Sequence, residues 1–236
     1  MSDPYLDPPL DPQDFDWIIF DVDGVLLELT PPETALFLQA FAPLGIHTVS
    51  DDWNSYKKRN DLEIAKEVIE THFGRPARED EVAAVIAHYL RTIEVGLTSG
   101  TLRPKVLLGV PTTLEALSSQ REREGRPRLG LASANLEQAA RLRLRAVGLE
   151  APFEVGGFAE HGTNKTETLT ALIMQNDMPP NRVLFIGDQS SDTAAALENG
   201  VTFLGIASEP EHQAKLRLAG AQLIAPDLPT AGLLGR

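Results

Sequence analysis

The sequence predicts an α/β fold, namely a doubly wound parallel (Rossmann-like) sheet into which an all-helical unit is inserted. The first observation is an apolar run at residues 17–20, which has the length of a buried strand and ends in acidic residues. The second is the helical periodicity of residues 30–104, where no strand pattern occurs. The third is the alternation of helix and strand patterns from Val106 onward, as a parallel sheet requires.

The composition is that of a folded, acidic protein. With 236 residues, 42% of them hydrophobic, the chain can bury a core in one large or two modest domains. The net charge of -13 disfavours non-specific binding to nucleic acid or an anionic membrane surface, because both are polyanions. A small anionic substrate is still compatible, since a few local cations or a metal can outweigh the global field. The composition does not indicate the oligomeric state.

Cysteine is absent from the chain, which excludes disulfide bonds and thiolate metal sites. The first residues are acidic and proline-rich, whereas a signal peptide begins with basic and then apolar residues. No apolar run approaches the length of a membrane span. We therefore expect a cytoplasmic protein.

The composition of residues 1–14, in which Asp-Pro recurs every four positions, predicts an extended, acidic, proline-rich leader. Proline removes backbone donors and the aspartates repel one another, so we expect this segment to add little to the core.

Two acids, Asp21 and Asp23, follow the strand predicted at residues 17–20, and Gly24 allows a tight turn directly after them. Ligands of an open parallel sheet bind beyond the carboxyl ends of its strands, so these acids are candidates for chemistry. Taken alone, Asp-x-Asp-Gly is equally typical of a calcium loop or an ordinary turn.

Residues 30–104, here called the helical insert, contain three apolar stripes with helical spacing. The stripes lie at 36–41, after Pro31 and Pro32, at 62–73, and at 82–93, behind the acidic first turn 79–81. Each stripe predicts a helix with one buried face. Residues 15–29 and 105–236 are then predicted to form the α/β core around this insert.

The remaining core elements follow from the same patterns. Strands are predicted at 129–132, 153–155, 183–186 and 201–206, and helices at 112–119, at 139–147, from Lys165 through 173, and from about 190 to 197. Ser133, Lys165 and Asp188 each follow a strand or begin a helix, which brings them to one edge of the sheet. Arg141, Arg143 and Arg145 are interpreted as a solvated helix surface.

Four ordered motifs carry a resemblance. They are Asp21-x-Asp23-Gly24, Ser133 after an apolar strand, Lys165 at a helix start, and Gly187-Asp188-x-x-x-Asp192. Together they resemble the haloacid dehalogenase-like hydrolase superfamily over residues 15 to about 225. The helical insert resembles the small helical cap of the phosphoglycolate phosphatase and beta-phosphoglucomutase branch. Val25 stands where threonine is more usual, at a position that mainly contributes backbone.

The resemblance implies phosphate chemistry, and the residue types suit it. Hydrolysis of a phosphate ester needs a nucleophile, a proton donor for the leaving oxygen and positive charge around the phosphoryl oxygens. Asp21 can attack phosphorus and form an aspartyl-phosphate. Asp23 is placed to protonate the leaving group and then to deprotonate the attacking water. The predicted catalytic residues are therefore Asp21, Asp23, Ser133 and Lys165.

A cation is needed between these acids and the phosphate, because the acids would otherwise repel one another. The predicted ligands are the carboxylates of Asp21 and Asp188 and the main-chain carbonyl of Asp23, and the predicted cofactor is Mg²⁺, which prefers such hard oxygens. Asp192 is expected to hold Lys165 or a metal-bound water.

The Ser133 hydroxyl, the Ala134 amide and the Lys165 ammonium are predicted to bind phosphoryl oxygens. Each residue alone also has a structural explanation. Ser133 or Asn135 can cap a helix, Lys165 can be a solvated lysine, and Asp188 can be a turn acid. Their joint order favours catalysis.

The resemblance further implies that the helical insert recognises the substrate beyond its phosphate. Residues 53–60 lie between the first two helices of the insert and contain its densest cationic run. Lys58 and Arg59 are the predicted specificity residues, together with Asn135, and Arg59 can bind a carboxylate with two hydrogen bonds. Such cations would attract a phosphorylated carboxylic acid or sugar acid. A solvated helix start is the alternative interpretation.

These patterns predict a magnesium-dependent phosphatase for a small phosphorylated metabolite, phosphoglycolate-like or sugar-phosphate-like. Asp23 favours the phosphate-handling branches, since the dehalogenase and phosphonatase branches lack an acid there. Two alternatives remain. A beta-phosphoglucomutase-type phosphomutase needs the same residues, and a noncatalytic binding protein on the same fold would ordinarily have lost one or more of them.

Overall fold

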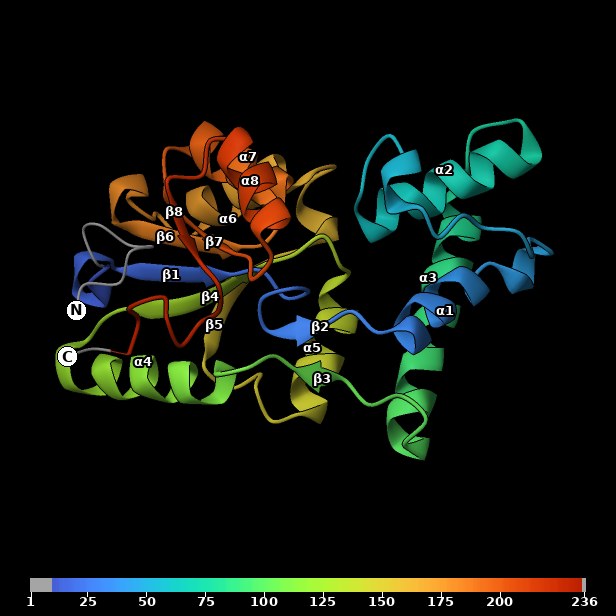
Figure 1. Ribbon diagram of the computed structural model, residues 1–236. Helices are drawn as coiled ribbons and strands as arrows, with labels where there is room; N and C mark the ends of the chain where they lie inside the picture. Colours follow the sequence, from blue (N-terminus) through green and yellow to red (C-terminus); the bar gives the residue numbers. More distant parts are fainter. Residues whose placement is uncertain (1–9, 235–236) are drawn as a thin grey trace.

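A six-stranded parallel sheet forms the centre of the protein, in agreement with the predicted fold class. The computed structural model describes residues 10–234 (Figure 1). The strands, in spatial order, are β5 (Phe153–Gly157), β4 (Arg128–Ala132), β1 (Trp17–Phe20), β6 (Val183–Gly187), β7 (Thr202–Ile206) and β8 (Leu223–Ala225). Every neighbouring pair runs parallel.

Helices cover both faces of this sheet, because both faces of β1 are apolar. Ile18 and Phe20 pack into the cluster formed with α4 (Val110–Glu124) and α5 (Glu137–Ala146). Trp17 and Ile19 pack into the opposite cluster, which is completed by α6 (Lys165–Gln175), α7 (Ser190–Asn199) and α8 (Pro210–Leu218). The strand therefore reads as a continuous apolar run, as buried parallel strands do.

The position of β1 defines where a ligand can bind. β1 pairs with β4 on one side and β6 on the other, so the chain winds away from it in both directions. The crevice at the carboxyl ends of these strands is the usual ligand site of an open α/β sheet. All the motif residues of the core follow β1, β4 or β6, or begin α6.

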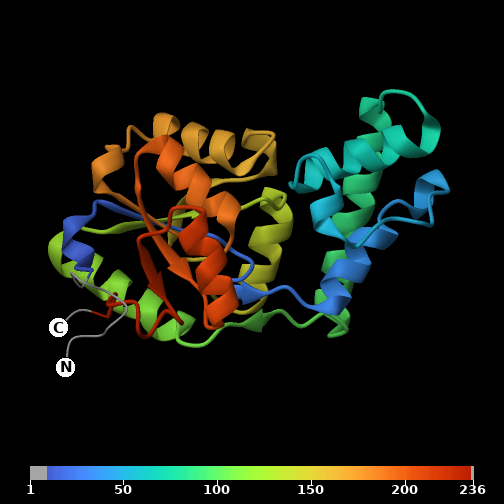
Figure 2. The ribbon, with the colours of Figure 1, turned by 45° about the horizontal axis from the view of Figure 1, so that its top comes forward.

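The helical insert stands to one side of the sheet and contains α1 (Pro31–Gln39), α2 (Asp61–Phe73) and α3 (Glu79–Ser99) (Figures 1 and 2). Its own apolar cluster includes Phe37, Ile69 and Val85. Leu136 and Ala139 of the core also belong to that cluster, so the insert packs against the loop before α5 and against α5 itself.

Two short strands join the insert to the core. β2 (Leu27–Glu28) and β3 (Lys105–Val106) pair antiparallel, so the two crossings of the chain lie side by side. These strands were not predicted, and neither were α8 and β8. The 3-10 helices are η1 (Pro12–Asp14), η2 (Ala42–Leu44), η3 (Trp53–Ser55), η4 (Ala159–His161) and η5 (Pro180–Arg182).

The predicted extended leader is wrong for its last residues. Pro12–Asp14 form η1, with the Asp11 side chain accepting from the Gln13 amide at 2.9 Å. Pro12 is buried and Leu10 packs against the core. Residues 1–9 of the leader lie outside the described residues. Within residues 10–234, no helix combines the length and the apolar character that crossing a membrane demands.

Candidate active site

Asp21 lies at the carboxyl end of β1, where its amide donates to the Ile186 carbonyl at 2.8 Å. Its side chain is 8% exposed, and Oδ1 accepts from the Val22 amide at 2.7 Å. The turn that follows needs a glycine, because Gly24 has a φ of +83° and a Cβ there would collide with the Asp188 carboxylate. The turn thus brings the acid loop directly against the loop after β6.

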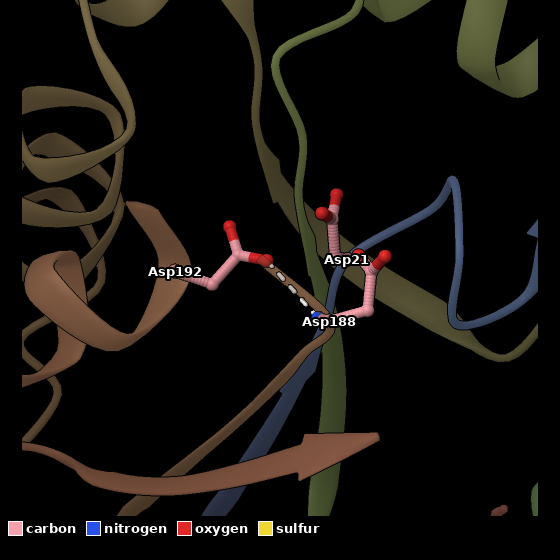
Figure 3. Close-up of side chains that lie close together, drawn as sticks. All are labelled: Asp21, Asp188 and Asp192. Atoms are coloured by element: carbon pink, nitrogen blue, oxygen red, sulfur yellow. Dashed lines mark hydrogen bonds between the residues drawn. The ribbon is translucent and has the colours of Figure 1, made fainter. Parts of the chain in front are cut away.

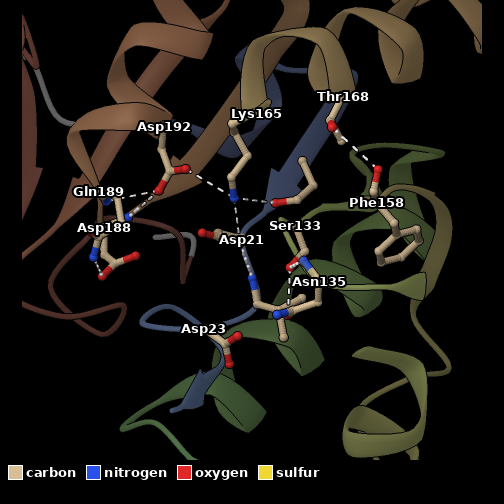
Figure 4. Close-up of polar contacts among 12 residues, drawn as sticks. Asp21, Asp23, Ser133, Asn135, Phe158, Lys165, Thr168, Asp188, Gln189 and Asp192 are labelled. Carbon is tan, nitrogen blue, oxygen red and sulfur yellow. Dashed lines mark hydrogen bonds and ion pairs between the residues drawn. The ribbon is translucent and has the colours of Figure 1, made fainter. Parts of the chain in front are cut away.

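Lys165, the first residue of α6, lies between two of the acids (Figure 4). Its Nζ is 2.8 Å from Asp21 Oδ1 and 3.1 Å from Asp192 Oδ1, and it donates to the Ala132 carbonyl at 3.1 Å. Burial alone would lower the pKa of Lys165, but the negative charges of Asp192 and Asp21 outweigh it and raise that pKa. Lys165 therefore lies beside Asp21 as a buried cation.

Ser133 follows β4 and is 2% exposed. Its amide donates to the Gly157 carbonyl at 2.9 Å, and its hydroxyl donates to Asn135 Oδ1 at 2.8 Å. Ala134 and Asn135 continue this loop and line a cavity that faces the helical insert. The loop after β4 thus lies across from the loop that carries Asp21 and Asp23 (Figure 4).

Three aspartates, Asp21, Asp188 and Asp192, come together in one buried cluster (Figure 3). Each offers an oxygen within 4.8 Å of the others. Asp192 is already engaged, because its Oδ2 accepts from the amides of Asp188 and Gln189 at 3.1 Å and 3.0 Å and its Oδ1 faces Lys165. Among the described residues, the buried Oδ1 of Asp188 has neither a hydrogen bond nor an ion pair, whereas the buried Oδ1 of Asp192 has only its ion pair with Lys165.

This donor set fits a hard divalent cation. A buried carboxylate oxygen without a partner is costly, and a cation beside Asp21 and Asp188 would satisfy it. Burial raises the pKa of Asp21 well above its ordinary value, the Asp192 and Asp188 charges add to this, and Lys165 opposes it. Burial likewise raises the pKa of Asp188 to about 6, with Asp192 adding to the effect. A bound cation would offset the accumulated negative charge.

The raised pKa of Asp188 gives a pH-dependent prediction. The pKa of about 6 in the folded protein exceeds the ordinary value of 3.8, so the protonated carboxyl contributes stability below about pH 4 that is lost as pH rises through 6. Mg²⁺ would bind the Asp188 carboxylate and so compete with that proton. At one fixed concentration, about 100 times its Kd at pH 7.5, Mg²⁺ should raise Tm by about 5–10 °C near pH 7.5, and by clearly less near pH 5, where its binding is weaker.

Differential scanning calorimetry with and without Mg²⁺ at the two pH values measures this difference. Asp188→Asn removes the carboxylate that titrates and should abolish most of the Mg²⁺-induced rise in Tm. An equal rise at both pH values, or a full rise in the variant, would contradict the assignment of Asp188.

Asp23 has a partner that the sequence analysis missed. Arg143 of α5 donates from Nη1 to Asp23 Oδ1 at 2.8 Å and from Nη2 to Asp23 Oδ2 at 3.3 Å. The interpretation of Arg143 as a solvated surface residue is wrong, because its side chain is only 2% exposed. Its neighbours Arg141 and Arg145 pair with Glu137 and Glu150, and these contacts are at least partly exposed.

A cavity of about 150 Å³ lies between the core and the helical insert. The core contributes Asp23, Ala134, Asn135 and Arg143, and the insert contributes Glu33, Arg59 and Asp61 with the aromatic rings of Phe37, Trp53 and Tyr89. Arg59 therefore lines the cavity, and it donates to Asn54 Oδ1 at 3.0 Å. Lys58 is instead paired with Glu63 at 3.2 Å and does not line this cavity.

Asp61, at the start of α2, is a second residue that the sequence analysis missed. Its amide donates to the Ala134 carbonyl at 3.0 Å, and its carboxylate accepts from the Leu136 amide at 2.9 Å. The preceding Asn60 donates to the Gly162 carbonyl at 2.8 Å. Burial raises the pKa of Asp61 to about 7, while the Leu136 bond and the charge of Arg143 oppose the rise. These bonds hold α2 against the core at the cavity.

The family model described as haloacid dehalogenase-like hydrolase matches residues 18–206. No curated protein matches the chain. Many solved structures also match the chain, and those named here have low sequence identity to it.

A predicted phosphoglycolate phosphatase from Haemophilus somnus is 18% identical, with a TM-score of 0.68 over 94% of this chain and 97% of that one. CbbY from Rhodobacter sphaeroides, in complex with phosphate, is 20% identical, with a TM-score of 0.67 over 94% of this chain and 96% of that one. The beta-phosphoglucomutase from Clostridium difficile is 18% identical, with a TM-score of 0.67 over 94% of this chain and 93% of that one. At these identities the likeness establishes the fold.

Proposed function

This chain belongs to the haloacid dehalogenase-like hydrolase family, and on that premise we propose that it is a magnesium-dependent phosphatase that hydrolyses a small phosphorylated metabolite through an aspartyl-phosphate. The observation that carries the proposal is the surroundings of Asp21. A buried cation, Lys165, lies 2.8 Å from its carboxylate, and the unpartnered oxygen of Asp188 lies in the same cluster. A carboxylate so placed meets the requirements of a nucleophile toward phosphorus.

Each side chain of the site has a separate role in the two steps of the proposed reaction. Asp21 attacks phosphorus, and the ester oxygen leaves with a proton from Asp23. Asp23 then accepts a proton from the water that hydrolyses the acyl phosphate on Asp21. Ser133, the Ala134 amide and Lys165 stabilise the charge on the phosphoryl oxygens, and Asp192 holds Lys165 in place through their 3.1 Å contact.

Mg²⁺ would be held by the carboxylates of Asp21 and Asp188 and by the Asp23 carbonyl. When bound, it supplies positive charge that neutralises the phosphoryl oxygens. The unpartnered Asp188 oxygen and the raised pKa of Asp188 support this assignment.

A panel of small phosphate esters tests the function directly. The panel should include phosphoglycolate, sugar phosphates, phosphorylated sugar acids and p-nitrophenyl phosphate, each with Mg²⁺ and with a chelator in excess. We expect Mg²⁺-dependent release of inorganic phosphate from at least one metabolite. A folded preparation that releases phosphate from none of them would overturn the proposal, and activity that survives the chelator would overturn its metal requirement.

A phosphomutase is the second candidate, favoured by the resemblance in fold to structures described as a beta-phosphoglucomutase from Clostridium difficile and a putative one from Thermotoga maritima. Such an enzyme uses the same core residues and differs in the acceptor of the phosphoryl group, a sugar hydroxyl instead of water. Incubation with a sugar phosphate and analysis of the products separates the two. Free sugar and inorganic phosphate support the phosphatase, and an isomeric sugar phosphate supports the mutase.

We further propose that residues 30–104 act as a cap that moves as a unit on the core formed by residues 15–29 and 105–236. The side-by-side crossings at β2 and β3 support this, since they form a narrow link. The bonds from Asn60 to Gly162 and from Asp61 to the loop after β4 are contacts of a closed state.

Distances between spin labels on α2 and α7 test the motion. With Mg²⁺ and vanadate the distribution should narrow toward the short distance, and without ligand it should broaden, because closure excludes water from the reacting phosphate. Asn60→Ala should shift the unliganded distribution toward longer distances. Identical distributions with and without vanadate would contradict cap movement.

For substrate recognition we favour Arg59 over Lys58, because Arg59 lines the cavity and Lys58 is paired with Glu63 outside it. Arg59→Ala should lower kcat/KM on the best anionic metabolite by about 10- to 100-fold, the value of a lost charge-assisted hydrogen bond, and leave p-nitrophenyl phosphate within about threefold. Lys58→Ala is the matched control and should change both substrates little. An equal fall in kcat/KM on both substrates would show that Arg59 does not recognise the part of the substrate beyond its phosphate.

A further inference from the structure

The guanidinium of Arg143 joins three parts of the protein that are far apart in the sequence. Nη1 donates to Asp23 and, at 3.3 Å, to Glu33 Oε1, while Nη2 donates to Asp23 and, at 2.7 Å, to Asn135 Oδ1. Asp23 belongs to the loop after β1, Asn135 to the loop after β4, and Glu33 to the first turn of α1. An arginine with a planar fork can fix all three acceptors at once.

Burial makes this cluster rigid. The side chains of Arg143 and Glu33 are 2% and 3% exposed. Burial by itself would lower the pKa of Arg143, but the charge of Asp23 and the hydrogen bonds to it, with Glu33 adding, raise that pKa further above its ordinary value. The arginine therefore carries its charge at every working pH, and its partners have little freedom to turn away.

Glu33 is itself held by the chain at the boundary of the helical insert. Its Oε2 accepts from the Thr30 amide and from the Thr30 hydroxyl, both at 2.8 Å, which closes the capping box at the start of α1. Thr30 follows β2, at the first crossing between core and insert. Arg143 is thus anchored on one side by the start of the insert and on the other by the loop of Ser133 and Asn135.

We propose that Arg143 is the positioning residue of Asp23, the proposed general acid and base, and that it fixes the Asp23 carboxylate in the orientation that both proton transfers need. The inference rests on the proposed phosphatase function. Its physical basis is that Asp23 is 22% exposed toward the cavity, so its carboxylate would be free to rotate without the two bonds from Arg143. A general acid acts only within hydrogen-bond reach of the leaving oxygen.

The inference predicts a particular kinetic pattern. An alkyl phosphate has a poor leaving group and needs the proton of Asp23 for the first step, whereas p-nitrophenyl phosphate leaves as a stabilised phenolate. Both substrates need Asp23 as the base that activates water in the second step. Loss of Arg143 should therefore slow kcat on the alkyl substrate by about 10²-fold or more. With p-nitrophenyl phosphate, the variant should release a burst of phenolate equal in molar amount to the enzyme, and slow turnover should follow.

The variants are Arg143→Lys, which keeps the charge and loses the fork, and Arg143→Met combined with Glu33→Gln. The second pair removes both charges together, so that no unpaired buried carboxylate remains at Glu33 to unfold the protein. Arg145→Met is the matched control on the same helix, because its side chain is 64% exposed and pairs with Glu150. The control should behave as the parent on both substrates.

A double-mutant cycle with Asp23→Asn completes the experiment. If Arg143 acts only through Asp23, the Arg143 substitutions should cause no further loss in the Asp23→Asn background. An equal loss in that background, a parent-like kcat on the alkyl substrate, or a folded variant without the burst would overturn the inference. The proposed function fails separately, and the inference with it, if the parent itself hydrolyses no phosphate ester.

Discussion

Asp21→Asn should reduce kcat by about four orders of magnitude or more on every substrate, because it removes the proposed nucleophile while keeping the shape of the side chain. The loss should not come from unfolding. Burial raises the pKa of Asp21 well above its ordinary value, which means that its charge is unfavourable in the folded protein. The variant without Mg²⁺ should therefore be at least as stable as the parent under the same conditions.

Steady-state assays and thermal unfolding of the same preparation measure the two quantities. Asp51→Asn, a substitution of an exposed acid in the helical insert, is the control and should change neither. A folded Asp21→Asn variant with near-parental activity would refute the nucleophile assignment. A variant that is inactive and also unfolded would refute the stability argument.

Lys165→Met should cause the second large effect, on stability and on catalysis together. Its ammonium is the cation that lies within 3.1 Å of both Asp21 and Asp192. Removing it leaves two buried carboxylates without their partner, which costs about 3–5 kcal/mol of unfolding free energy. It also removes the proposed stabiliser of the transferring phosphoryl group, so kcat should fall by about 10²- to 10³-fold.

The double variant Lys165→Met with Asp192→Asn separates these two effects. Neutralising Asp192 removes one uncompensated charge, so denaturant unfolding should recover part of the lost stability. The rate should not recover, because the cation beside the phosphate is still absent. Full recovery of kcat in the double variant would show that Lys165 is structural only.

Much of the fold follows from local patterns. The strand at residues 17–20, the three helices of the insert and the alternation after Val106 were all predicted, because each has a clear apolar run or an apolar period. The elements that were missed have weak patterns. β2 and β3 are two residues long, β8 has three, and α8 has Leu216 as its buried residue. The turn at Pro12 was missed although Asp-Pro also suits a helix start.

The candidate site likewise contains residues that the sequence predicts and residues that it does not. The acids of the motifs could be identified because each follows a strand, and their convergence follows from the parallel topology. The burial of Arg143 was not predicted, although its position in the helix indicates it. It lies three and four residues after Ala140 and Ala139, on the buried face of α5, whereas Arg141 and Arg145 share the opposite face. Its contact with Asp23, across 120 residues of sequence, depends on tertiary packing alone.

The most direct measurement of the central claim is the identification of the covalent intermediate. The reaction with the best metabolite is quenched with acid during steady-state turnover, treated with hydroxylamine, digested and analysed by peptide mass spectrometry. Hydroxylamine converts an acyl phosphate into a hydroxamate on the residue that carried it, so the account predicts this modification on Asp21 and its loss when Mg²⁺ is chelated. Full turnover with Asp21 unmodified, or the modification on another residue, would contradict it.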